Sequence, residues 1–253
     1  MDKETLSKIT DIIGKSKKIT VFTGAGISTN CGIPDFRGPN GLYNSVQKKY
    51  GLPYPEAIFD INYFRQNPEP FFNISKELFS TKISPSISHN FIAWLEKKNK
   101  IALVITQNID MLHRKAGNKK ILECHGTYIT AHCINCKKEY EIKEIKTSMK
   151  KGEVPYCSCG SYIKPDVVFF GEELPRDFYK TYQDPPETDL LLVMGTSLTV
   201  QPAANFALKI AENTTSIIVN LESTISDTIF NYSIKEDLDQ FSKQVWDELK
   251  KIL

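Results

Sequence analysis

The sequence has no long hydrophobic run. No segment approaches the ~18 consecutive apolar residues that a membrane span needs. Residues 1–18, MDKETLSKITDIIGKSKK, are charged throughout and contain no apolar stretch of signal-peptide length. We therefore expect no membrane association and a cytoplasmic protein.

An excess of charge of either sign is also missing. The 32 basic and 30 acidic side chains leave a net charge of +2, which does not favour a polyanionic partner such as nucleic acid. Hydrophobic residues make up 41% of the chain and charged residues 25%, the balance of an ordinary globular protein. A chain of this size can bury about three quarters of its unfolded surface, and we expect it to be a monomer.

A third glycine is missing from the stretch VFTGAGIST, residues 21–29. Gly24 and Gly26 follow a predicted strand and would let backbone amides approach a phosphate, with a helix expected after Ile27. The G-x-G-x-x-G fingerprint of dehydrogenases is nevertheless incomplete. A glycine pair after a strand is often only a turn, so this stretch alone does not separate a dehydrogenase from other nucleotide chemistry.

Apolar runs alternate with helical patterns along the chain. We predict strands at 18–23, 101–106, 190–194 and 216–220, and helices at 3–16, 88–98 and 202–213. Continuous apolar strands are typical of a parallel sheet covered on both faces. The pattern predicts a doubly wound, Rossmann-like α/β sheet, with one ligand collected at the polar carboxyl ends of its strands.

Two segments interrupt this alternation. Residues 38–85, rich in aromatics and proline, are interpreted as a helical insertion with a cofactor-binding lead, and 127–166 as a zinc-binding module. The Rossmann-like domain would then comprise 1–37, 86–126 and 167–253. Because 127–166 shows little apolar periodicity, we expect something other than a hydrophobic core to stabilise it.

Four of the six cysteines are clustered. Cys133 and Cys136 form a C-x-x-C, and Cys157 and Cys159 form a C-x-C after twenty intervening residues. Two thiolate pairs at this spacing can converge on one Zn²⁺, and four thiolates leave no open coordination position. We predict one structural zinc ion; free thiols or redox disulfides are the alternative.

The remaining histidines and cysteines are expected to have structural roles. His89 and His113 fall on predicted helices and are interpreted as surface or hydrogen-bonded residues. Cys31 and Cys124 flank the predicted site, and we interpret them as small packing residues and not as nucleophiles.

Seven motifs, together with the four cysteines, resemble the sirtuins, a family of NAD-dependent protein deacylases, in their bacterial-type, acetyl-lysine-preferring form. In the family's order they are GAGIS (24–28), GIPDFR (32–37), TQNID (106–110), HG (125–126), KPDVVFFGE (164–172), GTS (195–197) and VN (219–220). The resemblance covers the chain from about residue 18 to 240.

The resemblance implies NAD as a consumed co-substrate, held by loops at the strand ends. The implied contacts are Gly24, Ala25, Gly26 and Thr29 at the phosphates; Asp35, Phe36 and Arg37 at the ribose and phosphates; Gln107, Ile109 and Asp110 at nicotinamide and ribose; Gly195, Thr196, Ser197, Asn220, Leu221 and Glu222 toward the adenosine; and Asp237 and Leu238 at the adenine.

The resemblance also implies His125 and Asn108 as the catalytic residues. The acetyl-lysine oxygen would attack C1′ of the nicotinamide ribose and expel nicotinamide, with His125 as general base for a ribose hydroxyl. The products would be the free lysine and O-acetyl-ADP-ribose. An imidazole with an ordinary pKa near ~6.5 can accept that proton at neutral pH.

The implied partners are acyl-lysine proteins or peptides. Val168, Phe169, Phe170 and Gly171 resemble a strand that pairs with an extended peptide, against a second loop at 199–202. Sirtuins that prefer succinyl or malonyl groups carry a tyrosine and an arginine three apart, whereas Tyr63 and Arg65 are spaced by two. An uncharged acyl group is therefore favoured, acetyl first, with longer fatty acyl groups as an alternative.

Three other functions stay open at this point. A mono-ADP-ribosyltransferase on the same fold would leave ADP-ribose on protein, although His125 favours deacylation. A hydride-transferring dehydrogenase would reduce the cofactor. A zinc-ribbon nucleic-acid module would need a basic stripe, but the lysines of CKKEYEIKEIKTSMKK are mixed with glutamates, which is typical of a solvated face.

Overall fold

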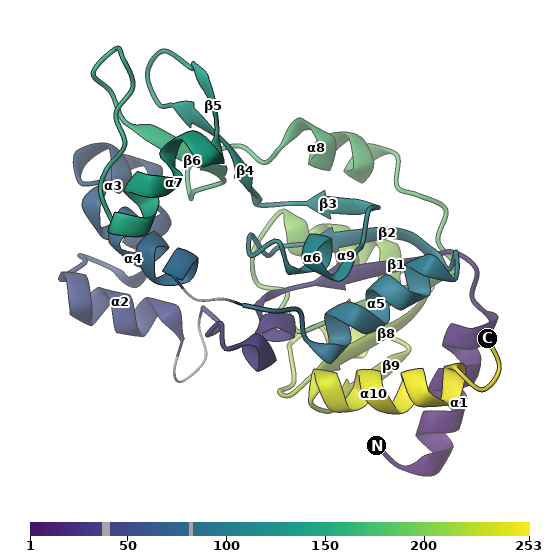
Figure 1. Ribbon diagram of the computed structural model, residues 1–253. Helices are drawn as coiled ribbons and strands as arrows, with labels where there is room; N and C mark the ends of the chain where they lie inside the picture. Colours follow the sequence, from purple (N-terminus) through teal and green to yellow (C-terminus); the bar gives the residue numbers. More distant parts are fainter. Residues whose placement is uncertain (37–40, 81–82) are drawn as a thin grey trace.

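A parallel sheet forms the larger part of the molecule. The computed structural model describes residues 1–36, 41–80 and 83–253 (Figure 1). Its six-stranded sheet has the order β3-β2-β1-β7-β8-β9, and every neighbouring pair is parallel. The strands are β1 (Ile19–Thr23), β2 (Ile101–Thr106), β3 (Ile121–Glu123), β7 (Leu190–Met194), β8 (Thr215–Asn220) and β9 (Tyr232–Lys235).

The four strands predicted from apolar runs are confirmed as the four central ones. β1 and β7 are buried at every residue, which explains why their sequences are continuous and not alternating. The edge strands β3 and β9 were not predicted, because three and four residues are too few to show a period.

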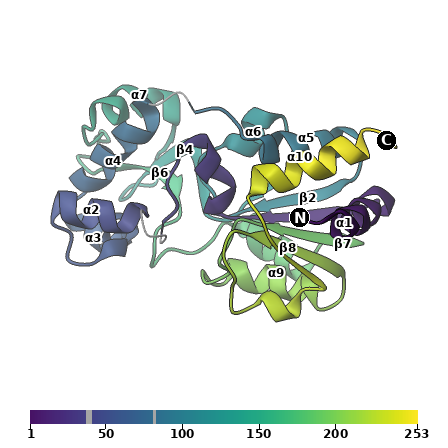
Figure 2. The same ribbon diagram turned by 90° about the horizontal axis from the view of Figure 1, so that it is seen from below.

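Helices cover both faces of this sheet (Figure 2). One face packs against α1 (Lys3–Lys15), α5 (Ile87–Lys97) and α10 (Leu238–Leu249), and the other against α8 (Arg176–Gln183) and α9 (Ala203–Ala211). The short α6 (Leu112–Ala116) follows β2. The doubly wound, Rossmann-like prediction is therefore confirmed.

A second lobe lies beside the sheet. It contains the short η2 (Pro55–Phe59), the helices α2 (Leu42–Tyr50), α3 (Ile61–Gln66), α4 (Glu69–Ser80) and α7 (Ile142–Lys151), and an antiparallel sheet of β5 (Glu139–Glu141), β4 (Gly126–Cys133) and β6 (Ile163–Val167). The insertion and the cysteine-rich segment, far apart in sequence, are side by side here (Figures 1 and 2).

The expectation that 127–166 lacks a hydrophobic core was wrong. Ile145 and Met149 of α7 are buried in one cluster with Phe71 and Phe72 of α4. Phe169 lies at its centre, with its ring centroid 5.0 Å from that of Phe71. The core was missed because its halves come from two segments, each too short to show it alone.

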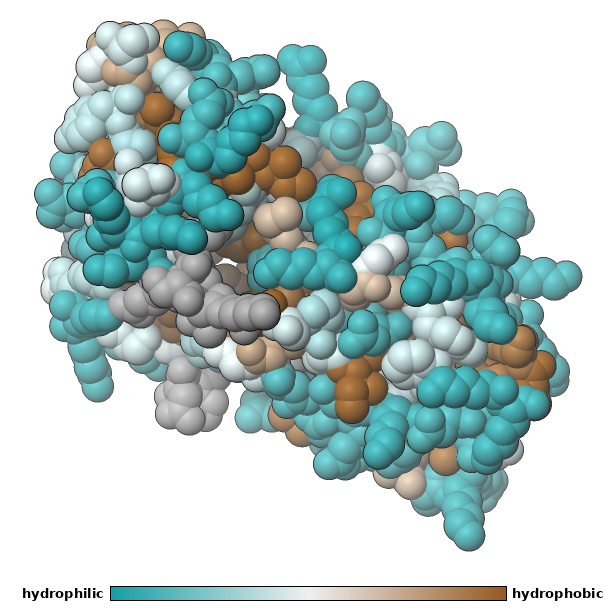
Figure 3. Space-filling view, in the orientation of Figure 1, coloured by the Kyte–Doolittle hydropathy of each residue, from teal (hydrophilic) through white to brown (hydrophobic). Residues whose placement is uncertain are grey.

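The surface is mainly hydrophilic on the face shown in Figure 3, where hydrophobic residues appear only as scattered patches. Within the three described ranges, the structure contains no helix with the length and hydropathy of a transmembrane segment.

Two buried histidines face each other between α5 and α6. The rings of His89 and His113 have centroids 4.8 Å apart, and both side chains are buried. Nε2 of His113 lies 2.9 Å from the Thr23 hydroxyl, while no described residue hydrogen-bonds Nε2 of His89 or Nδ1 of His113. Both lie on helices as predicted, and His89 also has one hydrogen bond, between its Nδ1 and the Ser86 hydroxyl over 2.9 Å. Of the two alternatives expected, they are hydrogen-bonded core residues and not surface ones.

This pair makes the stability of the fold depend on pH. Burial lowers the pKa of His89 to about 4 and that of His113 to about 3. The unfolded chain therefore binds more protons than the folded chain between pH ~6.5 and those values, so stability falls as the pH falls through that window.

We expect each histidine to remove about 2 kcal/mol from the free energy of unfolding between pH 7 and pH 5. The measurement is urea denaturation of the parent and of His113→Gln across this range. The variant should show the weaker pH dependence, because glutamine does not titrate. Equal pH dependence in both proteins would contradict the assignment.

Candidate active site

A cavity of about 560 Å³ opens between the carboxyl edge of the large sheet and the second lobe. It lies where β1 is flanked by β2 and β7 and the strand order reverses. In open α/β sheets this switch point is where ligands bind, and the volume is within the range of small-molecule sites.

Most of the predicted site residues line this one cavity. They are Ala25, Gly26, Thr29, Asp35, Phe36, Gln107, Asn108, Ile109, His125, Val168, Phe169, Phe170, Gly171, Gly195, Thr196, Ser197, Asn220, Leu221, Glu222, Asp237 and Leu238. Gly24 and Asp110 are not in the lining, and Arg37 lies outside the described residues.

The glycines after β1 and β7 allow two loops to touch backbone to backbone. A Cβ on Gly24 would lie 2.6 Å from Cβ of Thr196, and one on Gly26 would lie 2.8 Å from Cα of Gly195. The Gly26 amide donates to the Gly195 carbonyl over 2.8 Å, so it is not free for a phosphate, contrary to the sequence-based expectation.

The helix expected after Ile27 starts earlier and is of a different type. The 3-10 helix η1 (Ala25–Cys31) begins directly after Gly24 and ends at Gly32, which has a left-handed conformation. The short loop therefore passes into η1 without the α-helix that a dehydrogenase fingerprint would open.

His125 is oriented by the backbone. Its Nδ1 lies 2.8 Å from the carbonyl oxygen of Gln107, and a carbonyl can only accept, so Nδ1 carries the proton and Nε2 a free lone pair. Burial lowers the pKa of His125, and the bond to Gln107 opposes this only in part. The imidazole is therefore neutral at pH 7 and able to accept a proton.

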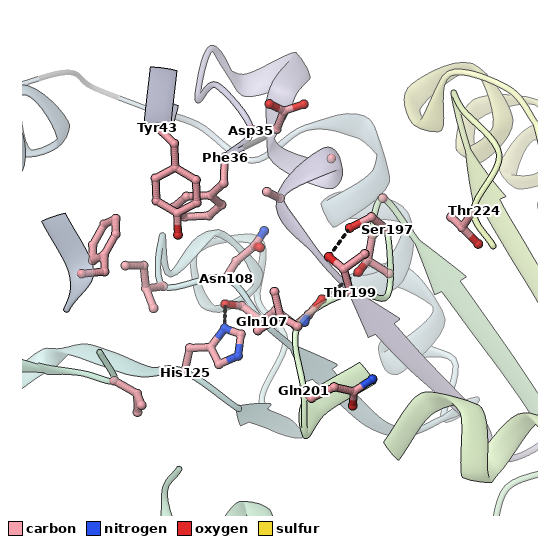
Figure 4. Close-up of a pocket in the computed structure, with 18 of the residues that line it drawn as sticks. Asp35, Phe36, Tyr43, Gln107, Asn108, His125, Ser197, Thr199, Gln201 and Thr224 are labelled. Carbon is pink, nitrogen blue, oxygen red and sulfur yellow. Dashed lines mark hydrogen bonds between the residues drawn. The ribbon is translucent and has the colours of Figure 1, made fainter. Parts of the chain in front are cut away.

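Figure 4 shows His125 beside Asn108 and Gln107 in the cavity, with Phe36 on the side of the insertion. The Phe36 ring packs against Tyr43, with centroids 5.4 Å apart. One wall of the cavity is thus aromatic, while the wall near His125 carries amides.

Gly126 sets the path of the chain next to His125. It has a φ of +77°, and a Cβ would lie 1.9 Å from the carbonyl oxygen of Asp166 in β6. Only glycine permits both this conformation and this contact.

We expect Gly126→Ala to lower the free energy of unfolding by more than about 3 kcal/mol. Gly117→Ala is the matched control: Gly117 also has a positive φ, of +107°, but its Cβ would meet nothing within 4 Å, so the cost should be about 1 kcal/mol. Urea denaturation measures both, and equal losses would show that the contact with Asp166 is unimportant.

Asn108 is buried and held in place by its amide. The amide nitrogen donates to the Gly24 carbonyl and the Ser28 hydroxyl, over 3.1 and 3.2 Å. Ser28 in turn donates to Asp110 over 2.7 Å. Asp110 therefore lies behind the cavity wall and supports Asn108 through Ser28.

A second set of hydrogen bonds connects three strand ends. The Asn220 side chain bonds both backbone groups of Thr196, over 3.0 Å each, and the Thr196 hydroxyl donates to the Gln107 side chain over 2.8 Å. The Gln107 carbonyl in turn accepts from His125. Residues at the carboxyl ends of β8, β7 and β2 therefore form one hydrogen-bond chain that ends at the imidazole.

Asp237, which lines the cavity, caps the N-terminus of α10. Its carboxylate accepts from the Asp239 and Gln240 amides and from the Asn30 side chain. Asp237 and Leu238, the contacts that the resemblance implies for the adenine, both line the cavity.

The segment Val168–Gly171 is not a strand in this structure. β6 ends at Val167, and Phe170 makes only an isolated bridge with Asp60. The Phe170 amide donates to the Phe59 carbonyl over 2.7 Å, so the segment is already attached to the insertion.

Several lining residues were not predicted. They are Tyr43, Phe59, Val167, Glu172, Leu174, Tyr179, Ser223 and Thr224. The first two lie in the aromatic-rich insertion, where the abundance of rings was the available signal. Val167 and Glu172 belong to the motif at 164–172 but were not identified as site residues. The other four follow a predicted motif or strand by a few residues, and nothing in their own sequence marks them.

The four clustered cysteines form a metal site. Their sulfur atoms all lie within 4.8 Å of one another, and the Cys133–Cys159 and Cys136–Cys157 pairs are each 3.5 Å apart. A tetrahedral zinc with Zn–S bonds of ~2.3 Å requires sulfurs about 3.8 Å apart. The cluster fits one structural zinc ion, with no position left for a substrate.

Cys31 and Cys124 lie away from this cluster. Cys124 is buried and Cys31 half-buried, and burial raises the pKa of both thiols. A raised thiol pKa is typical of packing cysteines, as predicted.

Comparison with known proteins agrees with this geometry. The sequence profile of the Sir2 family matches residues 24–202. NAD-dependent protein deacetylase sirtuin-2 of Danio rerio is 46% identical over 233 residues, which cover 88% of this chain and 61% of that protein. NAD-dependent deacetylase sir2D of Dictyostelium discoideum is 41% identical over 257 residues, 99% of this chain and 47% of its own length.

The chain therefore spans about half to three fifths of these curated relatives. Solved structures match over nearly their full length. One Sir2 enzyme superimposes with a TM-score of 0.88 at 39% identity, covering 100% of both chains. A Sir2 protein in complex with a p53 peptide and NAD+ gives 0.82 at 36% identity, covering 96% of this chain and 98% of that one. On the family profile, the identities and the shared fold, this chain belongs to the Sir2 family.

Proposed function

We propose that the protein is an NAD-dependent protein-lysine deacetylase. The observation that carries the proposal is the neutral His125, whose Nδ1 proton is bound to the Gln107 carbonyl and whose Nε2 is left to accept a proton in the cavity. The names of its relatives, NAD-dependent deacetylases, support the same activity.

The residues of the cavity fit a dinucleotide. The loops at the ends of β1 and β7 touch so closely that a Cβ on Gly24, Gly26 or Gly195 would clash, and Gly26 and Gly195 both line the cavity. Hydroxyl and amide groups of Ser197, Thr199 and Gln107 line it as well, and such groups suit ribose and phosphate oxygens.

When bound, NAD supplies a ribose carbon from which nicotinamide can leave. In this proposal Gln107 and Ile109 hold the nicotinamide and its ribose, Asn108 is the second catalytic residue, and Phe36 shields the reactive ribose from water. His125 takes the proton of a ribose hydroxyl at Nε2, and the Gln107 carbonyl stabilises the resulting imidazolium through Nδ1–H.

We further propose an acyl-lysine protein or peptide as the partner, bound along Val168–Gly171, and acetyl as the preferred acyl group. Tyr63 and Arg65, nearest in type to a carboxylate-binding pair, do not line the cavity, and the Tyr63 hydroxyl accepts from Asn67 over 3.2 Å. The aromatic wall of Phe36, Tyr43 and Phe59 favours an uncharged acyl group.

A longer fatty acyl group is the second candidate on the same site. The observation in its favour is that the lining of the cavity also includes the apolar residues Phe59, Val167 and Leu174. A solved relative bound to a myristoylated histone peptide shares 34% identity and a TM-score of 0.79. Deacylation rates on acetyl and myristoyl forms of one peptide would rank the two.

The experiment for the main proposal is incubation with NAD and an acetyl-lysine peptide, with products followed by mass. We expect free nicotinamide, the unmodified lysine peptide and O-acetyl-ADP-ribose. ADP-ribose retained on protein would instead indicate a mono-ADP-ribosyltransferase, and nicotinamide absorbance of a reduced cofactor would indicate a dehydrogenase. A cytoplasmic location, a monomeric state and the absence of nucleic-acid binding stay predictions.

A further inference from the structure

Lys164 is a buried lysine that the proposed chemistry does not use. It lies in β6 with 7% of its surface exposed, outside the lining of the cavity. A buried ammonium is costly unless its hydrogen bonds are satisfied, so its partners show what it holds in place.

All three N–H donors of Lys164 have acceptors close to the segment Val168–Gly171. The ammonium donates to the carbonyl oxygens of Val167 and Pro165, over 2.6 and 3.2 Å. Its third partner is the Glu172 carboxylate, 2.9 Å away. It also lies 4.3 Å from the centroid of the Phe169 ring.

Glu172 directly follows the segment and hydrogen-bonds back to it. The carboxylate oxygen that meets Lys164 also accepts from the Phe169 amide over 2.9 Å, and the Glu172 amide donates to the Phe169 carbonyl over 3.0 Å. Gly171, with a φ of +88°, provides the turn between them. The Lys164 ammonium thus bonds backbone carbonyls just before the segment, and the Glu172 carboxylate bonds a backbone amide within it.

The insertion holds only part of the segment. The Phe170 carbonyl accepts from Ile61 over 3.1 Å, and the Phe170 amide donates to Phe59 over 2.7 Å. Those two bonds fix the backbone of Phe170, the Val168 amide donates to the His125 carbonyl over 2.8 Å, and the Phe169 ring packs in the core. The backbone amide and carbonyl of Phe169 both bond Glu172, so the turn at Gly171 depends on Glu172 and on Lys164, the partner of its carboxylate.

From this the geometry points to Lys164 and Glu172 as positioning residues for acyl-peptide binding. The pair fixes the turn from Phe169 to Glu172, and its bond to the Val167 carbonyl fixes the start of Val168–Gly171. It therefore sets how this segment faces the cavity in which a peptide would bind. The inference rests on the proposed deacetylase function. The hydrogen bonds of this pair do not reach the loops after β1, β7 and β8, so the NAD side should be affected little.

The test compares Lys164→Met with the parent in steady-state kinetics on an acetyl-lysine peptide. We expect the KM for the peptide to rise about tenfold, the KM for NAD to change less than about twofold, and kcat to fall less than about threefold. The His125 imidazole is oriented by the Gln107 carbonyl and not by the pair, so kcat should change less than the peptide KM.

Glu172→Gln is the milder second variant, because its side-chain oxygen can still accept from Phe169 while the charge is lost. We expect the peptide KM to rise about threefold. Lys146→Met is the matched control: Lys146 is exposed on α7, and its replacement removes the same charge from the same lobe. It should leave both KM values unchanged.

Zinc content and the thermal midpoint, measured on every variant, identify loss of fold. A role in folding alone would lower the amount of active protein and reduce kcat without a selective change in peptide KM, and that result in both variants would overturn the inference. Unchanged kinetics in both variants would overturn it as well. If the parent itself neither releases nicotinamide nor binds a labelled acetyl-lysine peptide, the proposed function has failed, and the inference fails with it.

Discussion

His125→Ala is expected to lower deacetylation of an acetyl-lysine peptide by about a thousandfold. A positioned general base contributes roughly 10²–10⁴-fold, and the Nε2 of His125 is the base available next to Asn108 in the cavity (Figure 4). The measurement is the initial rate of peptide deacetylation at saturating NAD.

The substitution should lower the reaction rate without lowering the stability of the fold. Among the described residues, the His125 side chain hydrogen-bonds Gln107 alone, so the thermal midpoint should change little. His113→Gln serves as the control, because it removes a histidine that does not line the cavity and should keep most of the activity. A His125→Ala protein as active as the parent would contradict the assignment of the base.

Removal of zinc is expected to unfold the β5-β4-β6 module and abolish activity. Structural zinc sites contribute apparent binding free energies of about 10–16 kcal/mol in small domains. Here the four cysteines connect the turn after β4 to the turn before β6. Gly126 of β4 pairs with Val167 of β6. Gly126 follows His125 in sequence, and Val167 precedes the segment Val168–Gly171. Loss of the module therefore also disrupts the site.

Cys133→Ser and treatment with a chelator should give the same result: loss of bound zinc, loss of near-UV circular dichroism and no deacetylation. Cys31→Ser is the control, because Cys31 lies outside the cluster and its replacement should retain one zinc per chain. Full activity in a chain shown to be free of zinc would contradict the structural role.

The sequence predicted those features that a local pattern encodes. The four central strands were predictable because burial on both faces makes their runs continuously apolar, as in Leu190–Met194. The zinc ligands were predictable because Cys133, Cys136, Cys157 and Cys159 are paired at knuckle spacing. The division into three parts, with boundaries at 37, 85, 126 and 166, stays a prediction.

Features that depend on contacts between distant segments were not predictable. Glycine is required at position 26 because a Cβ there would clash with the backbone of Gly195, which is distant in sequence. From the sequence alone we expected the Gly26 amide to be free for a phosphate, but it donates to the Gly195 carbonyl. The shared core of α4 and α7 was missed for the same reason. The tautomer of His125 likewise depends on a carbonyl eighteen residues away, at Gln107.

The central claim is that NAD is consumed as a substrate and not recycled as a redox carrier. The most direct measurement is the stoichiometry of free nicotinamide to deacetylated lysine in one reaction, with peptide and nicotinamide quantified by mass. The account predicts one nicotinamide for each acetyl group removed, with the acetyl group recovered on ADP-ribose. Deacetylation without nicotinamide release, or accumulation of reduced cofactor, would contradict it.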